Sequence, residues 1–196
     1  MGTLHLFATP WWVNLLLFVP VISFWIWRKR GLTLTVRQLC LAAVFASAFG
    51  FAESAVVVYL RAASGLLPGY EGTLSDVAMH SAEQRKLDPN GHELPPSLAT
   101  VEVFREAATM LMLSSVAVLI GRTRRESWAA FLWIFAIWDL SYYLGLWATI
   151  RWPDSLLSSD VLFLIPVPWI SQVWFPVLVS SLAVLAVATT KRTLRT

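Results

Sequence analysis

The segment Val101–Leu113, VEVFREAATMLML, decides how the chain folds, because it opens a long apolar run and yet carries three charged side chains. Glu102 and Glu106 are four residues apart and therefore share one face of a helix, and Arg105 lies on nearly the same side. Ionisable side chains are rare within a bilayer, where they pair with one another or mark a functional site. The segment predicts a membrane helix with a polar group near its beginning.

The composition of the whole chain agrees with a membrane protein. Of its 196 residues, 57% are hydrophobic and only 14% are charged, whereas soluble domains are about 25% charged. A helix that spans a membrane needs roughly 20 mainly apolar residues. The segments that meet this requirement are about 10–28, 38–60, 99–121, 127–149 and 165–188. We therefore expect an all-α polytopic protein with five transmembrane helices and one membrane domain over residues 1–196.

Basic residues gather on one side of these predicted helices. They are Arg28, Lys29, Arg30, Arg37, Arg122, Arg124, Arg125, Lys191, Arg192 and Arg195. Cytoplasmic loops are enriched in Lys and Arg, so this asymmetry predicts an outside N-terminus and a cytoplasmic C-terminus. We expect the bacterial inner (cytoplasmic) membrane as the location. The basic residues stand in short runs at segment ends and do not form a phosphate-binding stripe, so no nucleic-acid partner is expected.

Three of the predicted helices carry a carboxylate to a similar depth. At about 1.5 Å per residue, Glu53 and Glu106 each lie about 24 Å along a helix from the basic residue at its inner end, and Asp139 lies about 21 Å along. The sequence therefore predicts one polar layer in the outer half of the membrane. Glu102 is one turn higher, at its entrance. The segment 38–60 is also rich in Ala, Ser and Gly, which favours a central packing helix.

Two connections between the helices are unusual. The stretch of about 62–98 is long and polar and is expected to form an outer loop. Residues 153–165 are too few to span a membrane but too apolar for an ordinary loop, so we expect a re-entrant or interfacial segment, which is allowed where protein covers its backbone. Either arrangement would bring Asp160 over the polar layer.

The main functional hypothesis is an outward-facing pocket within the membrane that binds or acts on a lipid-linked or anionic amphipathic substrate. Glu53, Glu106 and Asp139 would act as general acids or bases, or as ligands of a divalent cation, since oxygen ligands suit Mg²⁺, Mn²⁺ or Ca²⁺. Arg105 would grip an anionic group of the substrate. The other residues expected to contact the substrate are Glu102, Tyr142, Tyr143 and Asp160.

Two alternatives remain open, and the sequence leaves undecided whether the chain is an enzyme. In the first alternative the charged residues pair with one another, and the chain is a structural or assembly subunit of a larger membrane complex. In the second the acids form a relay in a small proton- or cation-coupled transporter, which would need a homodimer. The expected partners are thus the lipid bilayer and either another membrane protein or a second copy of the chain.

Overall fold

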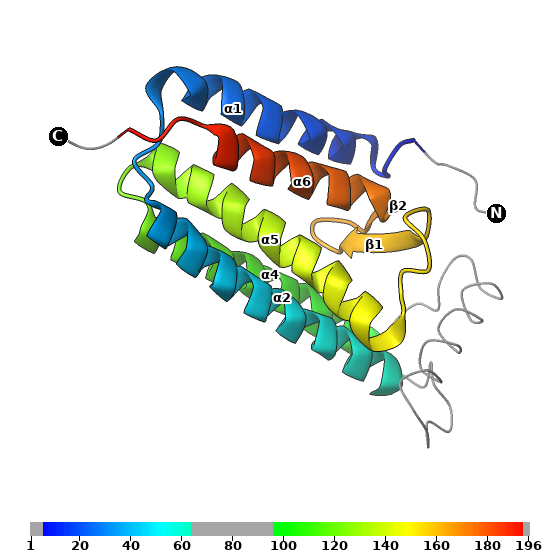
Figure 1. Ribbon diagram of the computed structural model, residues 1–196. Coiled ribbons are helices and arrows are strands. Elements are labelled where there is room, and N and C mark those ends of the chain that lie inside the picture. Colours follow the sequence, from blue (N-terminus) through cyan, green and yellow to red (C-terminus); the bar gives the residue numbers. More distant parts are fainter. Residues whose placement is uncertain (1–5, 64–95, 194–196) are drawn as a thin grey trace.

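The computed structural model describes residues 6–63 and 96–193 and is mostly helical. Its elements are, in chain order, the 3-10 helix η1 (Trp11–Leu17), α1 (Phe18–Arg30), α2 (Val36–Ala63), α4 (Pro96–Ile120), α5 (Arg124–Ile150), the strands β1 (Ser159–Phe163) and β2 (Trp169–Gln172), and α6 (Trp174–Thr189). The long helices run side by side as a bundle (Figure 1). The predicted outer loop falls almost entirely outside the described residues.

Four helical stretches of the described chain are long and apolar enough to cross a membrane. They are Trp11–Arg30, Val36–Tyr59, Thr100–Ile120 and Arg124–Ile150. These stretches lie close to the first four predicted spans. The fifth predicted span, 165–188, is helical only from Trp174, so α6 is a shorter apolar helix of 16 residues.

The expectation of an all-α fold needs a correction, because β1 and β2 form a two-stranded antiparallel sheet. Asp160 lies opposite Ser171, and Val161 opposite Ile170. The connection between the strands contains Pro166 and Pro168, which have no N–H group to donate to a helix or a strand ladder. The predicted re-entrant or interfacial segment at 153–165 contains β1, the first strand of a hairpin that occupies one end of the bundle (Figure 1), and its place relative to a membrane stays a prediction.

Helix α5 is the centre of the bundle, since it packs against α2, α4 and α6. The small residues of α2 allow a very close approach to α5, although α2 is not itself the central helix. A Cβ atom at Gly50 would lie 2.4 Å from the carbonyl oxygen of Trp138, and one at Gly145 would lie 2.4 Å from Oγ of Ser54. The α2–α5 contact thus depends on glycine on both sides.

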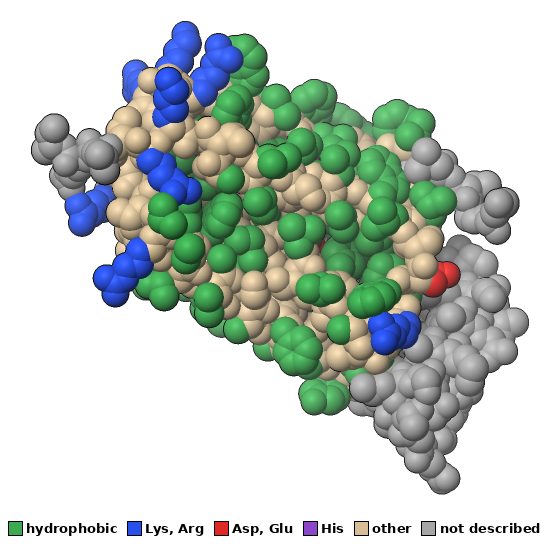
Figure 2. Space-filling model, in the orientation of Figure 1, with side chains coloured by type: hydrophobic (Ala, Val, Ile, Leu, Met, Phe, Trp, Pro, Cys, Tyr) green, Lys and Arg blue, Asp and Glu red, His purple; other side chains and the backbone are tan. Residues whose placement is uncertain are grey.

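The end of the bundle opposite the hairpin is rich in Lys and Arg (Figure 2). There Glu126 is only 3% exposed. Its carboxylate accepts hydrogen bonds from the hydroxyl of Thr33 and from the backbone N–H of Arg122, the latter at 3.1 Å. The hydroxyl of Thr123 caps α5 by accepting from the backbone N–H of Glu126 at 3.3 Å. Glu126 therefore joins the loop before α2 to the beginning of α5.

Replacing Glu126 with alanine is expected to lower the free energy of unfolding by roughly 1–3 kcal/mol, because two donors lose their acceptor in a buried place. The measurement is unfolding in mixed micelles as SDS is titrated into dodecyl maltoside. The matched variant Glu126→Gln retains one side-chain oxygen and should lose about half as much. If the alanine variant is as stable as the wild-type protein, Glu126 does not stabilise the junction between the loop before α2 and the beginning of α5.

Candidate functional site

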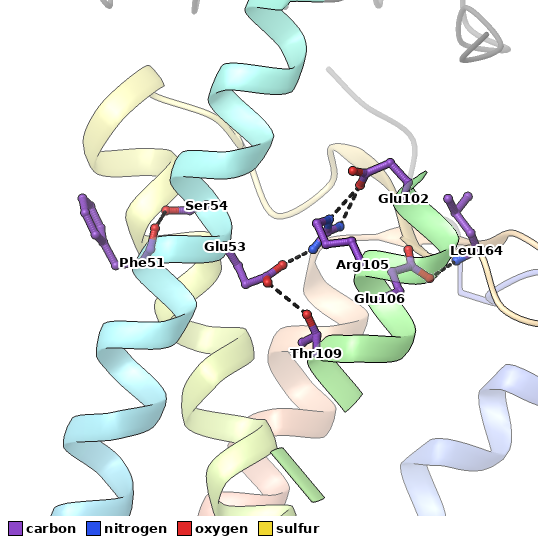
Figure 3. Close-up of polar contacts among 8 residues, drawn as sticks. All are labelled: Phe51, Glu53, Ser54, Glu102, Arg105, Glu106, Thr109 and Leu164. Carbon is purple, nitrogen blue, oxygen red and sulfur yellow. Dashed lines mark hydrogen bonds and ion pairs between the residues drawn. The ribbon is translucent and has the colours of Figure 1, made fainter. Parts of the chain in front are cut away.

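The most densely connected polar group lies between α2 and α4 (Figure 3). Nε and Nη2 of Arg105 lie 2.9 Å and 2.8 Å from Oε2 of Glu102, one turn earlier on α4. Nη1 of Arg105 pairs with Oε2 of Glu53 on α2. The other oxygen of Glu53 accepts from the hydroxyl of Thr109 at 2.9 Å. Arg105 is therefore held between two carboxylates, and both oxygens of Glu53 are engaged.

Glu106 faces the hairpin and not this ion-pair group. Its Oε2 atom accepts a hydrogen bond of 2.8 Å from the backbone N–H of Leu164, which lies just after β1 (Figure 3). Leu164 is partly buried, and the pairing of β1 with β2 ends at Phe163, so the strand ladder gives its backbone N–H no acceptor. Glu106 thus provides the acceptor and attaches the hairpin to α4.

A third set of polar contacts joins α5 to α6 and to β1. Asp139 is 8% exposed, and its Oδ2 atom accepts from the hydroxyl of Ser180 at 2.7 Å. One turn further along α5, the hydroxyl of Tyr143 donates to Oδ2 of Asp160 at 2.9 Å. Each carboxylate therefore binds a neutral donor from a different element of the fold.

These groups surround one cavity with a volume of about 100 Å³. The residues predicted from the sequence that line it are Glu53, Arg105, Glu106, Asp139, Tyr142, Tyr143 and Asp160. Glu102 does not line the cavity; it is buried beside Arg105 and was expected at the entrance. The cavity is thus formed by α2, α4, α5, α6 and the hairpin together, with Leu16 of η1 at its edge.

Several residues that line the cavity were missed by the sequence-based interpretation. Ser180 bonds to Asp139, and its only signal in the sequence is a polar pair, Ser180-Ser181, inside an apolar run. Trp138 and Trp169 also line the cavity, but tryptophan in a membrane helix is explained equally well by lipid contact. The backbone N–H of Leu164 leaves no signal in the side-chain pattern at all.

The arrangement does not assemble a metal site from these acids. Within residues 6–63 and 96–193, no group of three or more His, Cys, Asp and Glu side chains is placed to hold a metal ion. Instead, Glu53 binds Arg105, Glu106 binds Leu164, and Asp139 binds Ser180. A divalent cation shared by Glu53, Glu106 and Asp139 stays a prediction from the sequence.

Comparisons of the chain with protein-family models, with curated proteins and with solved structures gave no match. Its function is therefore argued from the site alone. The fold and the site define a helical bundle with a small cavity lined by ionisable and apolar side chains, and many large apolar side chains of the helices are exposed on the face seen in Figure 2.

Proposed function

We propose that the chain is an integral membrane protein whose cavity binds the polar group of a lipid-linked or other amphipathic molecule, with Asp139 and Glu106 placed to exchange protons with it. The observation that carries this proposal is the convergence of ionisable side chains from separate elements on one cavity. Placing a single charged residue at the centre of a membrane helix costs roughly 2.5–3.5 kcal/mol. The free-energy cost of placing several such residues around one cavity is therefore large, and a protein whose helices served only to contact lipid would have no reason to bear it.

The cavity belongs to the outer half of the membrane in this proposal. Hairpin residues such as Asp160 and Phe163 line it, and the hairpin lies at the end away from most of the Lys and Arg residues (Figures 1 and 2). The positive-inside rule assigns the basic end to the cytoplasm. Thr9, before the first helix, is joined to the hairpin by backbone hydrogen bonds with Ile170 and would then lie on the outer side.

Arg105 acts as a counter-ion in this arrangement, because Glu53 and Glu102 already bind its guanidinium group. The sequence suggested a grip on an anionic substrate, which would require these ion pairs to open. Asp139 and Glu106 instead accept hydrogen bonds from neutral donors. A carboxyl group bonded in this way can take up or release a proton without breaking an ion pair, which suits general acid or base chemistry.

The test is replacement of Asp139 with asparagine and, separately, of Glu106 with glutamine. Both variants keep the size of the side chain, so we expect them to fold, while the amount of amphipathic molecule that co-purifies falls at least tenfold. The measurement is mass spectrometry of lipid extracts from protein purified in mild detergent. The matched control is Asp154→Asn, at an exposed aspartate outside the cavity lining, which should behave as wild type.

One specific observation favours a second candidate, a structural subunit. Apart from the Arg105–Glu102 pair within α4, the polar contacts at the site join two elements of the fold: Arg105–Glu53 joins α4 to α2, and Asp139–Ser180 joins α5 to α6. If the Asp139 and Glu106 variants unfold, or retain all the bound molecule, these contacts serve stability and the structural function is the better one. Retention in the Asp154→Asn control with loss in both cavity variants supports binding.

A further inference from the structure

We infer that the basic end of the bundle is a binding surface for the head groups of anionic phospholipids. The surface, called the basic patch below, consists of the Lys and Arg residues within 28–30, 122–125 and 191–192. It lies at the end of the bundle opposite the hairpin (Figure 2). This inference therefore goes beyond the proposed function, which concerns the cavity beside the hairpin.

The fold joins three separate basic stretches into one surface. The backbone N–H of Leu32 donates to the carbonyl oxygen of Lys191 at 2.9 Å, so the chain after α6 lies beside the end of α1. The carboxylate of Glu126 accepts from the hydroxyl of Thr33 and from the backbone N–H of Arg122. The turn before α5 therefore lies beside the same loop. Residues from the beginning, the middle and the end of the sequence thus carry their positive charges to one place.

These positive charges have no carboxylate to neutralise them in the described part of the chain. The side chains of the patch are exposed, apart from the partly buried Arg125. The acidic residue at this end is Glu126, which is buried and bonded to neutral donors. Between described residues, the ion pairs are those of Arg105, which is in the polar group near the cavity. An anionic partner with phosphate oxygens would supply the acceptors that Lys and Arg side chains bind most strongly.

The apolar residues next to the patch indicate that this partner is a lipid. Leu119 is 84% exposed and stands three residues before Arg122, and Ile26 is 60% exposed and stands two residues before Arg28. A nucleic acid would offer phosphates but no acyl chains for these leucine and isoleucine side chains. An anionic phospholipid offers both parts in one molecule. Clusters of Lys and Arg directly beside a membrane helix attract such lipids.

The contact between Arg28 and Trp25 places one charge of the patch at the required depth. The guanidinium carbon of Arg28 lies 3.7 Å from the centroid of the Trp25 ring, which is exposed. This distance is typical of a cation–π interaction. Tryptophan side chains in membrane proteins prefer the level of the lipid head groups. The charge of Arg28 is therefore held where the phosphates of a lipid lie.

The experiment measures lipid binding to the full chain by native mass spectrometry. The chain is delipidated in mild detergent and mixed with equimolar phosphatidylglycerol and phosphatidylcholine that have identical acyl chains. We expect phosphatidylglycerol adducts to exceed phosphatidylcholine adducts at least fivefold. Raising the ammonium acetate concentration from about 0.1 to about 0.5 M should lower this ratio, because salt screens exposed charges.

A triple variant tests whether the three stretches act together. Arg30→Gln, Arg124→Gln and Arg192→Gln remove one exposed charge from each stretch, and together they should lower the ratio of the two adducts at least threefold. The matched triple variant has lysine at the same three positions, keeps every charge and should retain the wild-type ratio. Arg151→Gln removes an exposed arginine at the other end of α5 and should also leave the ratio unchanged.

The outcomes separate the lipid from other anions and this inference from the proposed function. Equal binding of the two lipids to the wild-type chain would overturn the inference, as would an effect of Arg151→Gln equal to that of the glutamine triple variant. Displacement of phosphatidylglycerol by inorganic phosphate or by single-stranded DNA, at equal phosphate concentration, would assign the patch to that anion instead. The wild-type comparison remains decisive if a variant fails to fold. No cavity residue is changed, so a failure here leaves the proposed function standing.

Discussion

Replacing Arg105 with methionine is expected to lower the free energy of unfolding by roughly 3 kcal/mol, because the change leaves two buried carboxylates without their counter-ion. Glu53 and Glu102 are 6% and 7% exposed. The guanidinium group is partly accessible, with 24% of the side chain exposed, so the expected loss lies at the low end of the range for a broken buried pair. SDS titration in dodecyl maltoside, followed by far-UV circular dichroism, measures the change.

A second variant distinguishes loss of the ion pair from loss of packing. In the double variant Arg105→Met with Glu53→Gln, the carboxylate on α2 is neutral, so about half of the lost stability should return. The control Arg124→Met removes an exposed arginine and should change stability by less than about 0.5 kcal/mol. If Arg105→Met and Arg124→Met have equal effects, the ion pairs contribute nothing to stability.

Replacing Gly50 with leucine is expected to destabilise the bundle by about 3 kcal/mol, at the upper end of the range for overpacking. The first side-chain carbon would lie 2.4 Å from the backbone oxygen of Trp138 and 2.9 Å from Cβ of Ser141. Backbone atoms of α5 cannot rotate away, so α2 and α5 must separate. The better helix propensity of leucine offsets only about 1 kcal/mol.

The measurement is the Tm of detergent-purified protein, read as the fraction that remains monodisperse after heating. Ala48→Leu is the matched control, because Ala48 lies on the same helix at an exposed position and a larger apolar side chain there would face lipid. We expect its Tm to equal that of the wild-type protein. A Gly50→Leu variant as stable as this control would show that α2 and α5 are not in close contact.

The helices could be predicted from the sequence because the signal for a long apolar helix is local. The apolar runs around Phe51 and Phe131 are each sufficient to predict a helix. The hairpin was missed because its strands depend on each other: Asp160–Phe163 pairs with Trp169–Ser171, and neither run is distinctive alone. Pro166 and Pro168 disfavour a helix at these positions, but the turn between two paired strands depends on both strands together.

The sequence could predict which residues line the cavity only as far as their depth along a helix determines this. Counting residues grouped Glu53, Glu106 and Asp139 at one level, and all three line the cavity. Lateral position could not be obtained in this way, because it depends on which helices are neighbours. The sequence therefore left open which acid binds Arg105, whereas in the structure Glu53 and Glu102 bind it and Glu106 binds the hairpin.

The packing of α2 against α5 also has a consequence for how the protein is made. The indole N–H of Trp133 donates to the carbonyl oxygen of Leu39 at 2.9 Å, across 94 residues of sequence. At a synthesis rate of about 5–20 residues per second, α2, which ends at Ala63, is complete roughly 4–14 seconds before Trp133 of α5 exists. Until α5 is made, Gly50 lacks its close neighbour Trp138, and until α4 is made, Glu53 lacks Arg105. Gly50 and Glu53 of α2 are therefore made before the residues they contact. The insertion machinery must accommodate the newly made α2 until α4 and α5 have been synthesised.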